Sequence, residues 1–210
     1  MGGAQSGMGE GEERRGAMRV LVACEFSGIV RNAFRRMGHE AWSCDLLPAD
    51  DRSDFHIQGD ARDVLADGWD LLMVAHPPCT RLCNSGVRWL AERNLWRELD
   101  EAAELFSAFW NASIERVAVE NPVMHRHAKE RIRNYAEPAQ SVQPWQFGHG
   151  ETKRTCLWLR NLPKLRPTCV VAGRTPRVHL MPPSPTRWKE RSRTFEGIAE
   201  AMAQQWGSLA

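Results

Sequence analysis

Apolar and polar stretches alternate along the chain in a way that predicts strands and helices in turn. The short apolar or β-branched runs typical of buried strands are 19–24, 39–47, 69–76, 115–122 and 155–160. Apolar residues at helical spacing mark the ranges 28–38, 95–113 and 192–206. Strands that alternate with helices indicate an α/β fold, with a mostly parallel sheet and helices on both faces.

The first 17 residues do not share this pattern. They are rich in glycine and charge and cannot bury a core, which predicts a disordered leader. Gly2 and Ser6 fit the loose N-myristoylation pattern, but a chance match in a flexible tail is the favoured interpretation. Residues 18–210 are enough for one well-buried domain and hardly for two.

Composition narrows the class of protein further. The 210 residues are 42% hydrophobic and 26% charged, which is ordinary for a soluble globular domain. We expect no membrane span, because no run of about 18 apolar residues occurs, and no secretory signal. The six cysteines then favour free thiols in a reducing, cytoplasmic environment.

Net charge is only +2 but is unevenly distributed along the chain. Residues 150–193 contain eleven lysines and arginines, against only Glu151 and Glu190. An excess of this size predicts a polyanionic partner. The alternative is a solvated loop that is simply rich in arginine.

Chemically active residues follow four of the predicted strands. They are Cys24–Glu25, Asp45, residues 76–79, and Glu120–Asn121. Because ligands of parallel sheets bind outside the carboxyl ends of the strands, we expect these four groups to meet at one edge of the sheet.

The turn after the first strand, "ACEFSGIVRNAF", leads directly into a helix. Its backbone N–H groups could hold a carboxylate or a phosphate, although the G-x-G-x-x-G fingerprint is missing. Asp45 stands where nucleoside-binding folds accept a ribose. A role as a turn cap is the equal alternative for this acid.

Cys79 admits three interpretations. With His76 and Cys83 it could bind a metal, but this spacing is not a common zinc pattern. It could be a small packing residue in a proline turn. It could also be a nucleophile at a strand end, with Glu120 as the neighbouring acid.

The motifs "PPC" at 77–79 and "EN" at 120–121, each after a strand, resemble those of the DNA (cytosine-5) methyltransferases. "FSGIVRNAFRRMGHE", "GD" at 59–60 and "RSRTFEGIAEAMAQQW" resemble other segments of that family in the same order. The chain also resembles the short methyltransferase-like proteins of bacteriophages and prophages. The resemblance implies a Rossmann-like class I S-adenosylmethionine-dependent methyltransferase fold and a location in a bacterial or phage-infected cell.

The resemblance also implies the cofactor, S-adenosylmethionine, which leaves as S-adenosylhomocysteine, and no metal. The residues it assigns to cofactor binding are Glu25, Phe26, Ser27, Gly28, Asp45, Leu46, Asp60, Ala61 and Pro77.

For catalysis, the resemblance implies that Cys79 adds to the sixth carbon of cytosine while Glu120 hydrogen-bonds the ring. The fifth carbon then takes the methyl group. Pro78 would position the cysteine, and Asn121 would fix the loop that carries it. Cys83 is expected to be an incidental packing residue.

The implied partner is DNA, with a cytosine that is flipped from a duplex or lies in a single strand. The residues proposed to contact it are Thr80, Ser85, Lys153, Arg154, Arg174, Arg177, Arg187 and Lys189. Residues 166–191 replace the family's target-recognition domain with a short basic segment rich in proline and arginine, which we call the arm. An arm of this size predicts relaxed specificity or a partner protein that supplies it.

Two other functions remain open from the sequence. The same chemistry could act on RNA or on a free pyrimidine nucleotide. Alternatively, the fold could bind S-adenosylmethionine or nucleic acid without turnover.

Overall fold

The computed structural model describes residues 16–75 and 77–209 and contains a seven-stranded sheet. The strands are β1 Arg19–Ala23, β2 Glu40–Asp45, β3 His56–Gln58, β4 Leu71–Val74, β5 Arg116–Asn121, β6 Gln140–Val142 and β7 Thr155–Arg160. Their order is β3-β2-β1-β4-β5-β7-β6. β1 to β5 are parallel, and β7 runs antiparallel to both of its neighbours. This arrangement is compatible with a Rossmann-like fold.

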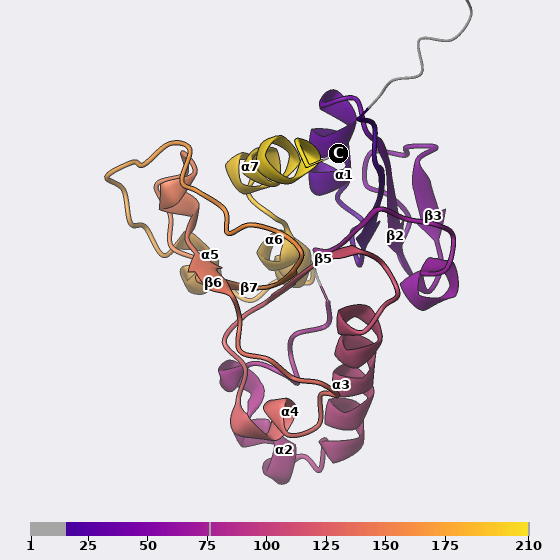
Figure 1. The fold of residues 1–210 in the computed structure, drawn as a ribbon. Helices are drawn as coiled ribbons and strands as arrows, with labels where there is room; N and C mark the ends of the chain where they lie inside the picture. Colours follow the sequence, from indigo (N-terminus) through magenta and orange to yellow (C-terminus); the bar gives the residue numbers. More distant parts are fainter. Residues whose placement is uncertain (1–15, 76, 210) are drawn as a thin grey trace, which may run out of the picture.

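Helices cover both faces of the sheet, as predicted (Figure 1). They are α1 Ile29–Arg36, α2 Arg88–Glu92, α3 Trp96–Trp110, α4 Arg126–Lys129, α5 Arg177–Leu180, α6 Arg187–Ser192 and α7 Glu196–Gly207. α1 and α7 pack on one face through Phe34, Met202 and Trp206. α3 packs on the other face through Leu99 and Phe106. Every residue of β4 is fully buried, because its side chains alternate between these two layers.

The sequence predicted five of the seven strands and the three long helices, with ends shifted by a few residues. β7 begins and ends where expected, whereas the closing helix begins at Glu196 rather than at 192. The strands β3 and β6 were missed because each has only three residues and no alternating pattern of its own. Most of the leader at 1–17, including Gly2 and Ser6, lies outside the described residues.

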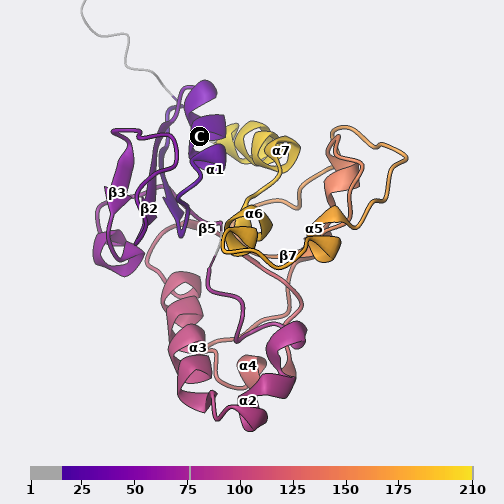
Figure 2. The same ribbon diagram turned by 180° about the vertical axis from the view of Figure 1, so that it is seen from behind.

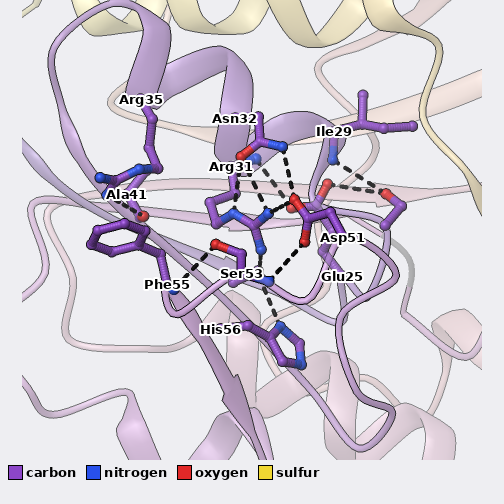
Figure 3. Close-up of polar contacts among 12 residues, drawn as sticks. Glu25, Ile29, Arg31, Asn32, Arg35, Ala41, Asp51, Ser53, Phe55 and His56 are labelled. Atoms are coloured by element: carbon purple, nitrogen blue, oxygen red, sulfur yellow. Dashed lines mark hydrogen bonds and ion pairs between the residues drawn. The ribbon is translucent and has the colours of Figure 1, made fainter.

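A buried arginine joins α1 to the loop after β2 (Figure 3). Arg31 is fully buried, and its guanidinium donates to Ser43 Oγ at 2.8 Å and forms an ion pair with Asp51. Ser43 Oγ also lies 2.8 Å from His56 Nδ1 on β3. The network therefore ties α1 to β2 and to the edge strand β3.

Replacing Arg31 by methionine is expected to lower the free energy of unfolding by about 2–3 kcal/mol, because a buried polar network loses its central donor. Chemical denaturation measures this change. Arg36→Met is the matched control, since this exposed arginine lies 3.8 Å from Glu200 and such pairs contribute less than about 1 kcal/mol. Equal effects of the two substitutions would contradict the role of the network.

Candidate active site

The four predicted residue groups do follow parallel strands and therefore lie at one edge of the sheet. His76, which belongs to the third group, lies outside the described residues. Two cavities open at this edge. The first has a volume of about 740 Å³ and the second about 440 Å³.

The first cavity collects five of the nine residues assigned to the cofactor. They are Phe26, Asp45, Leu46, Asp60 and Ala61. Asp45 accepts a hydrogen bond from Leu47 N at 2.9 Å, and burial raises the pKa of its carboxyl group. Asp60 pairs with Arg62 at 2.5 Å, and this contact lowers the pKa of Asp60. Asp45 thus caps its own turn through Oδ1 and also lines the cavity, so the turn-cap role and a ligand role are compatible.

Glu25, Ser27 and Gly28 support the turn beneath α1 and do not line the first cavity. Glu25 is fully buried and accepts hydrogen bonds from Val30 N at 2.7 Å and Arg31 N at 3.1 Å. The helix N–H groups expected to hold a ligand's carboxylate or phosphate are thus used by the chain's own carboxylate. Burial raises the pKa of Glu25 to about 7 even though these two bonds favour its charged form.

Gly28 adopts a φ of 71°, in the left-handed region that favours glycine. A Cβ atom at this position would lie 2.3 Å from Arg31 Nη2. The glycine therefore keeps space for the buried arginine rather than for a ligand.

Helix α3 contributes an acidic wall to the first cavity that sequence reasoning missed. Glu98, Glu101 and Glu104 line the cavity together with Ala102 and Leu105. Their three-residue spacing places them on one side of the helix, and that signal was present in the sequence. With Asp45 and Asp60, they give the cavity an excess of carboxylates over Arg62 and Arg81, which suits a cationic ligand.

The second cavity brings together three of the four proposed catalytic residues, without Pro78. Its lining includes Cys79, Glu120, Asn121, Lys153 and Arg154. Pro77, Thr80 and Ser85 also line it. Pro77 therefore lies on the side opposite to the cofactor cavity to which it was assigned.

The segment 77–80 separates the two cavities. Pro78 lines the first cavity, Cys79 lines the second, and Thr80 lines both. A group that is transferred between ligands in the two cavities would therefore pass beside Cys79.

Cys83 is 7% exposed and lies beside the proposed nucleophile at the second cavity. Its backbone N–H donates to Cys79 O at 3.0 Å, and its thiol lies 3.0 Å from Ser85 Oγ. The Cys83 side chain, burial and the nearby Glu120 carboxylate raise the pKa of Cys79, whereas Lys153 lowers it. Because the thiolate is the nucleophilic form, Cys79 must lose its proton before it can react, and the Lys153 cation favours the ionised form.

The loop that carries Cys79 is held by residues 123–125 rather than by Asn121. Asn84 N donates to Val123 O at 3.0 Å, and His125 N donates to Leu82 O at 3.1 Å. The amide group of Asn121 is buried and has no hydrogen-bond partner among residues 16–75 and 77–209. An unpaired buried amide that lines a cavity is available to a ligand.

Glu120 is 8% exposed, and burial raises the pKa of its carboxyl group to about 7, although Lys153 acts in the opposite direction. The folded protein therefore binds the proton more tightly than the unfolded chain does, whose ordinary value is 4.5. Stability is consequently highest below about pH 4.5 for this group and falls as pH rises towards about 7.

Glu120→Gln is expected to remove the loss of folding stability that the wild type undergoes between about pH 4.5 and pH 7. The variant should therefore be more stable than the wild type at pH 8 by as much as about 3 kcal/mol. The difference should shrink to less than about 1 kcal/mol near pH 5. Chemical denaturation at both pH values measures it, with the exposed Glu92→Gln as control. A constant difference between the two pH values would contradict the raised pKa.

The arm lies on segment 144–151 and over the cavities. Arg174 stacks 3.8 Å from the ring centre of Trp145, and Arg177 pairs with Glu151 at 3.0 Å. Neither they nor Arg187 and Lys189 line the first or the second cavity. The arm instead places His179 and Arg191 at the second cavity, beside Lys153 and Arg154.

Within the described residues, no group of three or more His, Cys, Asp or Glu side chains is arranged to hold a metal ion. All six cysteines are described, and none forms a disulfide. In the same part of the chain, no helix combines the length and apolar character needed to cross a membrane.

No protein-family model matches this chain, and no curated protein matches it either.

Proposed function

We propose that this protein transfers a methyl group from S-adenosylmethionine to carbon 5 of cytosine in DNA. The observation that carries the proposal is the pairing of two adjoining cavities. Cys79, Glu120 and Lys153 line one, carboxylates line the other, and segment 77–80 separates them.

The residues of the first cavity fit S-adenosylmethionine. Its sulfonium and amino groups are cations, and the wall from α3 supplies Glu98, Glu101 and Glu104. Asp45 at the end of β2 suits the ribose hydroxyls. Phe26 offers an aromatic surface for the purine ring. When bound, this cofactor supplies an electrophilic methyl group.

In the second cavity, the Cys79 thiolate forms a bond to carbon 6 of cytosine, with the help of the Lys153 cation. Glu120, whose raised pKa of about 7 keeps a large share of it protonated near neutrality, donates this proton in a hydrogen bond to the ring nitrogen, which draws electrons away from carbon 6. The electron pair of the carbon 5–carbon 6 double bond becomes available at carbon 5 for the methyl group. Loss of the carbon 5 proton to a base then restores the double bond and expels Cys79 as a thiolate.

The charge around the second cavity favours a nucleic acid over a free nucleotide. Lys153, Arg154 and Arg191 all line it. Cations at the mouth of a cavity suit the phosphates that flank a flipped base.

Trapping with oligonucleotides that contain 5-fluorocytosine tests the proposal, because fluorine at carbon 5 is not eliminated. We expect a covalent adduct with DNA in the presence of S-adenosylmethionine, seen on denaturing gels. Cys169→Ser is the matched control, since Cys169 is exposed and lines neither cavity. An adduct with RNA alone would show that the substrate is RNA rather than DNA. The absence of any adduct would contradict covalent catalysis by Cys79.

A further inference from the structure

Helix α6 of the arm places an aromatic side chain at the first cavity. Trp188 lines this cavity, and its ring centre lies 5.9 Å from that of Phe26 in the turn between β1 and α1. Lys189 Nζ lies 5.5 Å from the Phe26 ring centre and 5.7 Å from that of Trp188. These cation–π contacts orient the indole over the cavity.

The same helix also borders the second cavity. Arg191 and Ser192 line it. Just beyond the helix, Arg193 pairs with Asp50 at 2.5 Å, and its carbonyl accepts a hydrogen bond from Lys153 Nζ at 3.0 Å. Figures 1 and 2 both draw α6 near the centre of the molecule, between α7 and α3. Helix α6 therefore contributes lining residues to both cavities.

Trp188 is 52% exposed, whereas Phe26 beneath it is only 3% exposed. A large aromatic side chain half in water at a cavity mouth gains burial when a flat ring fills the cavity. We propose that Trp188 is a cofactor-binding residue that closes on the purine ring of the nucleoside cofactor. This inference rests on the assignment of the first cavity in the proposed function.

Titration calorimetry with S-adenosylhomocysteine tests the role of Trp188. We expect Trp188→Ala to raise the dissociation constant at least about ten-fold, which lies within the range for base–aromatic stacking. Trp188→Phe should stay within about three-fold of the wild type, because it keeps an aromatic face. Leu180→Ala, a 74% exposed position elsewhere on the arm, should have no effect.

A dissociation constant of Trp188→Ala within about two-fold of the wild type would overturn the role of Trp188, since stacking removal costs more than this. If the wild type itself does not bind S-adenosylhomocysteine, the assignment of the first cavity fails, and the proposed function fails with it. The two failures are therefore distinguishable in one experiment.

Because α6 lines both cavities, a second measurement can test whether cofactor binding and oligonucleotide binding are coupled. Because Trp188 and Arg191 are on one short helix, cofactor binding should tighten oligonucleotide binding by at least about five-fold in the wild type. We expect this enhancement to disappear in Trp188→Ala at saturating S-adenosylhomocysteine, as measured by fluorescence anisotropy of a labelled oligonucleotide. An undiminished enhancement in the variant would overturn the coupling through α6.

Discussion

Cys79→Ser is expected to reduce methyl transfer to DNA at least about 1,000-fold, as the loss of a nucleophile does in other enzymes. Serine keeps the size of the side chain, but its hydroxyl group ionises far less readily than a thiol. Cys79 already has a raised pKa because of Cys83, burial and Glu120. Its reactivity thus depends on the small fraction of thiolate that a thiol can still form, whereas a serine hydroxyl forms essentially no alkoxide.

Radiolabelled methyl transfer to DNA measures this effect, and calorimetry with S-adenosylhomocysteine is the companion measurement. Cofactor affinity should be unchanged, since Cys79 lines the second cavity and not the first. Cys169→Ser should transfer methyl groups at the wild-type rate. A Cys79→Ser protein that remains active would show that the methyl acceptor is not activated by a covalent bond to this residue.

Glu120→Gln is expected to lower kcat/KM by about 10²- to 10⁴-fold, the usual contribution of a positioned acid or base. The glutamine amide cannot transfer a proton to the cytosine ring as the carboxyl group does. Burial raises the pKa of Glu120 to about 7, so half of the free enzyme carries this proton near neutrality.

The pH profile separates this role from a structural one. Activity needs a protonated Glu120 and an ionised Cys79, whose pKa is raised. In the wild type, kcat/KM should therefore rise with pH and level off near 7, as thiolate is gained and acid is lost. In Glu120→Gln the rise should continue through pH 7. A variant that levels off at the same pH would contradict the assignment.

The two predictions for Glu120 have one physical cause. The buried carboxyl group destabilises the fold at alkaline pH, and the same burial keeps its proton available for the substrate. We therefore expect Glu120→Gln to be the more stable and the slower protein above pH 7.

Much of the fold followed from local patterns. β1 and β4 are short apolar runs, and the stripe of Leu99, Ala103 and Phe106 marks the buried face of α3. Such patterns persist because burial of apolar surface is the main stabilising contribution to folding. β3 and β6 escaped prediction because their pairing partners, and not their own residues, define them.

The site was predicted less completely than the fold. Cys79, Glu120 and Lys153 do meet in one cavity, since β4 and β5 are neighbours and β7 lies beside β5. Glu25 was assigned to the ligand but instead binds the first turn of α1. Sequence adjacency to a glycine turn does not tell whether a carboxylate points outward or back under the helix.

The sequence by itself determined the order of strands and helices, and with it the edge where the strands end. Parallel strands place their carboxyl ends together, whatever residues follow them. Only the tertiary structure decided which residues face which cavity: Thr80 lines both, Lys153 lies with Cys79, and Trp188 reaches Phe26. These contacts depend on side-chain directions and on the packing of segments far apart in the chain, which no local pattern records.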